Sequence, residues 1–213
     1  MARTLRLTLA YDGTRYSGWQ TQPNKLTVQG ELERALAKIT GEEIRVIGSG
    51  RTDAGVHALE QVVSFSTAVA LSPAVFQRAL NGYLPHDIAV IAAEEPAPQF
   101  HAIADALWKH YRYLVHDGRF RDVFRRAYCW QYKCRLDAEA MHRAAQPLVG
   151  THDFRSFESH WPTRSSSVRT IRDISVRRSH DGCEDLIALD VTADGFLYNM
   201  VRTITGTLVD VGR

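Results

Sequence analysis

The sequence carries, between two predicted strands, the stretch Gly48-Ser49-Gly50-Arg51-Thr52-Asp53-Ala54-Gly55-Val56-His57-Ala58. Its three glycines allow backbone conformations that other residues rarely adopt, and they let a large ligand approach the main chain. Arg51 and Asp53 are two positions apart, so in an extended segment both side chains point to the same side. These residues alone leave two interpretations open. The stretch is either a site that receives a ligand, or a tight turn whose aspartate caps a backbone N–H.

The elements predicted around this stretch hold it at both ends. Residues 5–9 alternate apolar and polar positions as a half-buried strand does, and 44–46 and 61–65 are predicted strands on either side of the stretch. A helix is predicted from Val28, with Thr27 as its N-cap and Gly41 just past its end. Ser72-Pro73 indicates the start of another helix, and 88–93 a further strand.

The second half of the chain repeats a similar rhythm of strands and helices. Within 106–115, Tyr111 and Tyr113 fall on one face of a predicted strand, and His110 and Arg112 fall on the other. A helix is predicted to end near residue 150, followed by strands at 171–176 and 186–191. The last helix, predicted over 197–211, contains one cation, Arg202. An unpaired buried charge is unfavourable, so Arg202 either reaches solvent or pairs with an acid.

The composition is that of a globular chain with a sizeable core, since 45% of the 213 residues are hydrophobic. Lys and Arg total 26 against 24 Asp and Glu, so net charge alone says little about a nucleic-acid partner. The stretch 119–135 is different, because it carries six cations and one acid among five aromatic residues. It fits either an RNA surface or a solvated edge strand with aromatic packing.

Cysteine usage and the N-terminus bear on the cellular compartment. Cys129, Cys134 and Cys183 cannot all pair with one another, and no Cys-x-x-Cys metal spacing occurs. The first residues alternate polar and apolar and lack the apolar run of a signal peptide. No apolar stretch approaches the roughly 20 residues needed to span a bilayer. We therefore expect a cytoplasmic protein with reduced thiols, no metal and no membrane segment.

Several short motifs, in order along the chain, resemble the TruA-type tRNA pseudouridine synthases. Besides Gly50-Arg51-Thr52-Asp53-Ala54-Gly55-Val56-His57-Ala58, they are Tyr11-Asp12-Gly13, Tyr16-Ser17-Gly18-Trp19-Gln20, Ala79-Leu80-Asn81, Leu84-Pro85, Phe100-His101-Ala102, Tyr111-Arg112-Tyr113, His152-Asp153-Phe154, Ser167-Val168-Arg169-Thr170-Ile171 and Phe196-Leu197 through Gly206. The resemblance runs from about residue 5 to the last residue. It implies an α+β fold in which two fused ferredoxin-like halves, 1–104 and 105–213, form one mixed sheet with a central cleft.

The resemblance also implies the activity and the residues that carry it. The enzyme would isomerise uridine to pseudouridine in the anticodon stem-loop of tRNA, at the family's positions 38–40. It would act as a homodimer and without metal or organic cofactor. Asp53 would be the nucleophile, Tyr111 would stack on the base and relay a proton, and Arg202 would form an ion pair that keeps Asp53 ionised. Arg51 would contact the flipped nucleotide. Further RNA contacts are expected from Gln20, His57, Arg119, Arg121, Arg125 and Arg126.

The chain departs from the family pattern at three places. Ile103 stands where an arginine is usual after Phe-His-Ala, and Asp105 stands where a small residue is expected. Family members continue beyond the Val-Gly that here is Val211-Gly212, through a closing strand, so an open sheet edge is expected. These departures keep a second hypothesis open, a catalytically impaired, shortened relative that binds RNA or assists its folding. A carboxylate-based hydrolase would need a second catalytic acid, which the motifs lack.

Overall fold

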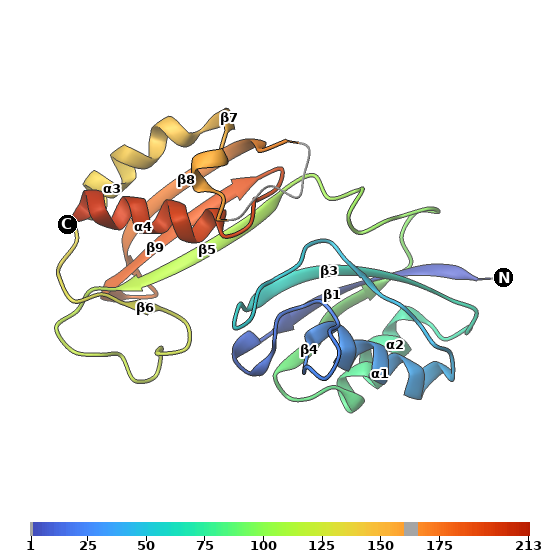
Figure 1. Ribbon diagram of the computed structural model, residues 1–213. Helices are drawn as coiled ribbons and strands as arrows, with labels where there is room; N and C mark the ends of the chain where they lie inside the picture. Colours follow the sequence, from blue (N-terminus) through green and yellow to red (C-terminus); the bar gives the residue numbers. More distant parts are fainter. Residues whose placement is uncertain (1, 160–165) are drawn as a thin grey trace. The chain divides into compact units, whose positions relative to one another are not determined.

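The computed structural model describes residues 2–159 and 166–213. The chain divides into two compact units, Met1–Ala106 and Leu107–Arg213, called here the N-terminal and the C-terminal unit. Each unit combines one β-sheet with helices (Figure 1). The predicted α+β class is therefore confirmed. The described strands pair as two sheets, one in each unit, and the joining of two ferredoxin-like halves into one mixed sheet stays a prediction.

The N-terminal unit has a four-stranded sheet of order β2-β3-β1-β4, in which all neighbours are antiparallel. Its elements are β1 (Arg3–Tyr11), a 3₁₀ turn (Gly13–Arg15), α1 (Val28–Thr40), β2 (Ile47–Gly48), β3 (Ala58–Thr67), α2 (Pro73–Tyr83) and β4 (Ile88–Glu94). Helices α1 and α2 lie on one face of this sheet (Figure 1). Leu5, Leu7 and Leu9 of β1 are fully buried in the core between the sheet and these helices, as the alternation of apolar and polar residues along β1 predicts.

Local capping explains why both N-terminal helices begin where the sequence predicts. Thr27 accepts a hydrogen bond from Gly30 N and caps α1, and Gly41 ends that helix in the left-handed conformation, with φ +70°. Ser72 caps α2 ahead of Pro73. The strand predicted over 44–46 is wrong, because β2 is confined to Ile47–Gly48, the residues that pair with β3.

The C-terminal unit has a mixed five-stranded sheet of order β6-β5-β9-β8-β7, in which only β5 and β6 are parallel. Its elements are β5 (Lys109–His116), β6 (Trp130–Gln131), α3 (Ala138–Ala145), 3₁₀ turns at Gln146–Leu148 and Arg155–Phe157, β7 (Gly150–Asp153), β8 (Val168–His180), β9 (Cys183–Ala193) and α4 (Met200–Gly212). Helices α3 and α4 lie side by side over one face of the sheet (Figure 1). Helix α4 begins three residues later than predicted, after Asn199, whose φ of +59° is not helical.

A buried carboxylate ties three elements of the C-terminal unit together. Asp117 follows β5, and its side chain is fully buried. It accepts two hydrogen bonds from Arg178 of β8, at 2.7 and 2.9 Å, and one from Leu136 N, at 2.9 Å, just ahead of α3. Burial opposes its ionisation, but Arg178, the Leu136 N–H and Arg135 together lower the pKa of Asp117 below its usual value.

Candidate active site

The stretch Ser49–His57, called here the motif loop, connects β2 to β3 in the N-terminal unit. Ser49 N donates to Val62 O of β3 at 2.8 Å, so the loop leaves the sheet from a fixed point. Val56 N donates to Asp53 O at 3.1 Å, which closes a turn directly after Asp53. Gln61 Nε2 of β3 donates to Gly50 O. The backbone on both sides of Asp53 is therefore held by hydrogen bonds.

The segment 11–19 forms the other support of the motif loop. Trp19 N donates to Thr52 O at 3.0 Å, and Gly55 N donates to Tyr16 O at 3.3 Å. The Tyr11 hydroxyl lies 2.8 Å from Thr52 Oγ1. These contacts hold Thr52, directly before Asp53, and Gly55, two residues after it.

Glycine is required where this support meets the motif loop. A Cβ on Gly18 would lie 2.6 Å from Thr52 O, and the residue has φ +93°. A Cβ on Gly13 would overlap the Val56 carbonyl. Either side chain would force the two segments apart, so the close backbone approach depends on these glycines.

His57 closes the far end of the motif loop. Its Nδ1 accepts a hydrogen bond from Gly13 N at 3.1 Å and lies 3.0 Å from Asp12 Oδ1. The ring is half-buried. This residue, which the resemblance offers as an RNA contact, thus also braces the loop within its own unit. Gln20, another such candidate, is half-buried directly after Trp19.

Asp53 and Arg51 are exposed although the backbone that carries them is fixed. Thr52 between them is half-buried. The loop therefore presents the Asp53 carboxylate and the Arg51 guanidinium to an incoming ligand, whereas the Thr52 side chain faces the N-terminal unit. An accessible carboxylate on a fixed backbone can act as a nucleophile or as a base.

Two further candidates lie in the C-terminal unit. Tyr111 of β5 is half-buried against the core of that unit, with its ring 4.9 Å from the Phe196 ring in an edge-to-face arrangement. Arg202 lies in the first turn of α4 and is exposed. Within the described part of its own unit it forms no ion pair. A cation is electrostatically disfavoured in the first turn of a helix, so this position favours an anionic partner for Arg202.

The model of one protein family, described as tRNA pseudouridine synthase, matches residues 8–103 and 144–213. The first range contains the motif loop, and the second contains Arg202. The chain belongs to the tRNA pseudouridine synthase family.

Relatives named tRNA pseudouridine synthase A align with almost the entire chain. The protein of Moorella thermoacetica is 50% identical over 211 residues, which are 98% of this chain and 84% of the relative. That of Geobacillus sp. (strain WCH70) is 48% identical over 214 residues, or 100% of this chain and 85% of the relative. That of Pelobacter propionicus is 46% identical over 211 residues, or 99% and 85%.

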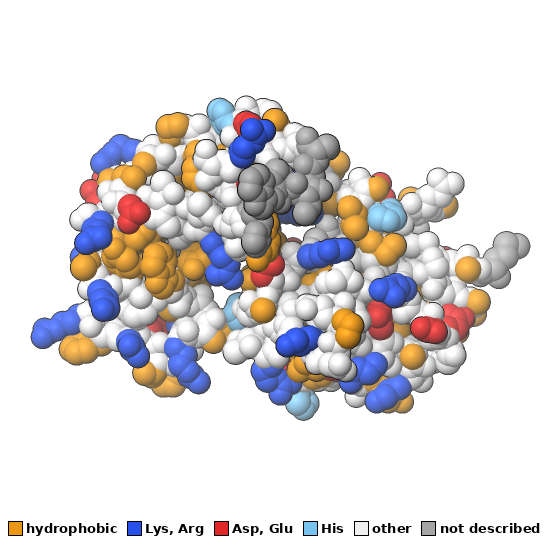
Figure 2. Space-filling model, viewed as in Figure 1, with side chains coloured by type: hydrophobic (Ala, Val, Ile, Leu, Met, Phe, Trp, Pro, Cys, Tyr) orange, Lys and Arg blue, Asp and Glu red, His pale blue; other side chains and the backbone are white. Residues whose placement is uncertain are grey.

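A pseudouridine synthase must also bind RNA. The residues 118–129 between β5 and β6, called here the basic loop, combine arginines with exposed aromatic side chains. Figure 2 shows blue and orange side chains interleaved over this loop, which Figure 1 shows in yellow-green. Phe120 is 77% and Phe124 88% exposed. The Arg119 guanidinium lies 5.4 Å from the centre of the Phe120 ring.

The four arginines proposed for RNA contact in the basic loop are not equivalent. Arg125 pairs with Asp122 at 2.8 Å, and this hydrogen-bonded pair lowers the pKa of Asp122. Arg126 donates to Val123 O, also at 2.8 Å, and has no acidic partner among the described residues. Arg121 is exposed. The charge of Arg125 is therefore partly neutralised, whereas that of Arg126 is available to an anion.

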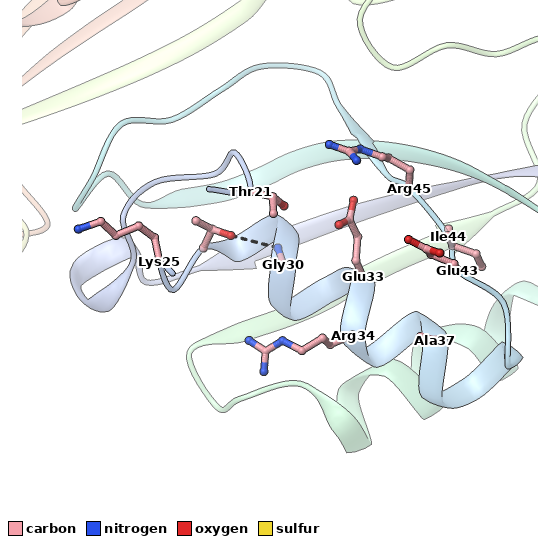
Figure 3. Close-up of a pocket in the computed structure, with 10 residues that line it drawn as sticks. Thr21, Lys25, Gly30, Glu33, Arg34, Ala37, Glu43, Ile44 and Arg45 are labelled. Atoms are coloured by element: carbon pink, nitrogen blue, oxygen red, sulfur yellow. Dashed lines mark hydrogen bonds between the residues drawn. The ribbon is translucent and has the colours of Figure 1, made fainter. Parts of the chain in front are cut away.

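A groove of about 510 Å³ lies elsewhere in the N-terminal unit, between α1 and residues 43–45. Figure 3 shows both acidic and basic side chains around it, among them Glu33 and Arg45. Glu33 is used internally, since it accepts hydrogen bonds from Gln29 and from Val46 N. No residue of the motif loop lines this groove. Among residues 2–159 and 166–213, no three His, Cys, Asp or Glu side chains are placed to hold a metal, and no helix could cross a bilayer.

Three residues that support the motif loop, Tyr11, Asp12 and Gly13, belong to the motifs that resemble the family, but the sequence alone predicts no role for them. Tyr11 and Thr52 are 41 positions apart, so their contact is a product of the tertiary fold. The available signal was the presence of a polar aromatic residue at the end of an otherwise apolar strand, directly before a glycine.

Proposed function

We propose that this chain isomerises uridine to pseudouridine in the anticodon stem-loop of tRNA. The observation that carries the proposal is Asp53, an exposed carboxylate on a braced loop inside the matched family segment. The identity to proteins named tRNA pseudouridine synthase A, 42–50% over nearly the whole chain, supports the same reaction here.

The reaction is an internal rearrangement of one nucleotide. The bond from C1′ of the ribose to N1 of uracil breaks, the base turns, and a bond forms from C1′ to C5. The proton on C5 leaves, and N1 gains one, so no electrons and no groups pass to another molecule. The site must supply a nucleophile or base, a group that relays the C5 proton, and surfaces that retain the detached base. Asp53 meets the first requirement, whether it adds to the ring, attacks C1′ or removes a proton from C2′.

We assign the remaining requirements to the C-terminal unit and to Arg51. The Tyr111 ring would stack on uracil, and its hydroxyl would handle the C5 proton. Arg202 would form an ion pair with Asp53 and orient its carboxylate. Arg51 would contact the phosphate of the nucleotide once it is flipped out of the stack. This proposal treats 1–104 and 105–213 as two ferredoxin-like halves of one catalytic fold, with the cleft formed by both.

The experiment is a tritium-release assay on tRNA that carries tritium at C5 of uracil. We expect Asp53→Asn to abolish release, because the amide keeps the shape of the side chain but is neither a nucleophile nor a base. Its tRNA affinity should stay within several-fold of the wild type. Glu60→Gln, which removes an exposed carboxylate from neighbouring β3, is the control and should be active. Turnover by Asp53→Asn above a few per cent of wild type would contradict the assignment.

A further inference from the structure

We propose that Tyr11 is a positioning residue, which holds Asp53 in its reactive place through a hydrogen bond to Thr52. The inference rests on the proposed function, since it concerns the same carboxylate. Tyr11 is the last residue of β1 and is only 4% exposed. Its hydroxyl lies 2.8 Å from Thr52 Oγ1, and its ring centre lies 6.2 Å from that of Trp19.

The pairing of β1 with β3 brings Tyr11 to the motif loop. The register shifts between Leu9 and Tyr11, so that Leu9 lies opposite Gln61 and Tyr11 lies opposite Ala58. Between these two pairs, the single residue Ala10 of β1 thus faces two residues of β3, Leu59 and Glu60. Irregularities of this kind bend a strand and redirect its side chains, and they are frequent beside active sites. Here the irregularity places the Tyr11 side chain next to the end of the motif loop, where its hydroxyl reaches Thr52.

Thr52 is held by both its main chain and its side chain, directly before Asp53. Its carbonyl accepts from Trp19 N at 3.0 Å, and its hydroxyl meets Tyr11. With the Thr52 peptide fixed, the Asp53 carboxylate keeps only the rotations of its own side chain. A misplacement of about 1 Å in a reacting group can slow a reaction by about 100-fold. The Tyr11 hydroxyl is thus tied to the rate of the chemical step more than to tRNA binding.

Tyr16 offers a matched comparison on the same segment. It is also buried, at 3% exposure, and its hydroxyl donates to Asp87 Oδ1 at 2.6 Å, on the connection between α2 and β4. Burial and this hydrogen bond raise the pKa of Tyr16 to about 12. Removal of the Tyr16 hydroxyl therefore deletes a buried hydrogen bond of the same unit without touching Thr52.

The test is a double-mutant cycle on Tyr11 and Thr52, with single-turnover rates measured at saturating tRNA. Tyr11→Phe keeps the ring, and Thr52→Val keeps the branched shape. We expect each to lower the rate by about tenfold or more, with little change in tRNA affinity, and the double variant to be no slower than the slower single one. Thr52→Ser retains the hydroxyl and should stay within about threefold of wild type. Tyr16→Phe should keep its rate within about twofold even where thermal unfolding shifts.

Three outcomes would overturn the inference. They are rates within twofold of wild type for Tyr11→Phe and Thr52→Val, additive losses in the double variant, or an equal loss in Tyr16→Phe, which would indicate a general effect of stability. If Tyr11→Phe does not fold, Thr52→Val and its rescue by Thr52→Ser decide the matter. An inactive wild-type protein would instead overturn the proposed function, and this inference with it.

Discussion

Tyr111 shows how a residue of the C-terminal core can also be a catalytic candidate. Its ring is half-buried and meets Phe196 edge-to-face, with the ring planes at 78°. Tyr113, two positions further along β5, packs against the same core. The core thereby restricts both rings, and a restricted aromatic ring offers a base a rigid stacking surface with little loss of conformational entropy.

Tyr111→Phe should separate the stacking role of the ring from the proton-handling role of its hydroxyl. We expect tRNA affinity to stay within about twofold, because the ring remains, and tritium release to fall by about 100-fold or more. Tyr113→Phe is the control and should release tritium at the wild-type rate. A fully active Tyr111→Phe enzyme would show that the hydroxyl has no part in the reaction.

At the level of single residues, the sequence identifies the candidate catalytic groups more easily than the residues that support them. Asp53 and Arg51 stand in one short motif, and both side chains are exposed in the structure. The contacts of Thr52 with Tyr11 and of His57 with Asp12 join segments distant in the chain. No local pattern encodes such contacts, because they depend on how β1 and β3 pair.

Individual elements were predictable where their ends are set locally. Helices α1 and α2 begin after the predicted caps, Thr27 and Ser72, since a cap involves only neighbouring residues. The prediction of a strand over 44–46 is wrong because strand pairing, and not propensity, decides which residues join β3. Helix α4 starts late because Asn199 takes a left-handed conformation that its sequence context did not reveal.

The buried carboxylate of Asp117, which connects β5, β8 and α3, gives a prediction about stability. Asp117→Asn should lower the free energy of unfolding by about 2 kcal/mol near neutral pH, because a buried carboxylate that accepts from Arg178 and Leu136 loses its charge. Asp185→Asn is the control. Asp185 pairs with Arg135 as well, but its side chain is 48% exposed, so the change should be under about 1 kcal/mol.

The difference in stability between wild type and Asp117→Asn depends on pH, and the direction of the Asp117 pKa shift sets how. Because the pKa of Asp117 is lowered in the folded protein, its stabilising effect is fully present above the ordinary carboxyl value of about 3.9. The effect is lost as the pH falls from there through the lowered pKa. Urea unfolding of wild type and Asp117→Asn should therefore converge in acid. A difference that grows as the pH falls would contradict this account.

The basic loop gives a prediction about RNA binding. Affinity for tRNA should fall with rising salt, because phosphate contacts release counterions. Arg126→Gln should reduce the slope of log affinity against log salt by about one, and Arg125→Gln by less, since Asp122 already neutralises Arg125. Phe124→Ala should weaken binding by about tenfold with the slope unchanged, as expected when a stacking contact is lost.

Two results would contradict this role of the basic loop. One is a salt response that stays flat between low and physiological ionic strength. The other is a change in the molecular mass of Phe124→Ala in solution, which would assign the exposed aromatic side chains to contacts between protein chains. The arginine and phenylalanine variants serve as controls for each other, because one changes charge and the other does not.

At the scale of the whole molecule, the proposed catalytic groups divide between the two units. Asp53 and Arg51 belong to the N-terminal unit, and Tyr111 and Arg202 belong to the C-terminal unit. The mixed α+β class and the family follow from the sequence, because the motifs extend along most of the chain. A single active site formed by both units remains the proposal that connects them.

Arg202→Met tests that connection. We expect a strong loss of activity with little change in tRNA affinity, because the proposed partner of the Asp53 carboxylate is removed. Arg143→Met removes an exposed arginine from α3 in the same unit and should leave the activity unchanged. Wild-type activity of Arg202→Met would remove the ion pair from the mechanism.

The central claim is that this chain, acting through Asp53, makes pseudouridine in the anticodon stem-loop. Its most direct test is primer-extension mapping of pseudouridine in unmodified tRNA after incubation with the purified protein. We predict new pseudouridines in the anticodon stem-loop with the wild type and none with Asp53→Asn, which should still bind the tRNA. Wild-type protein that binds tRNA and leaves every uridine unchanged, or an Asp53→Asn variant that produces the same map, would contradict the account.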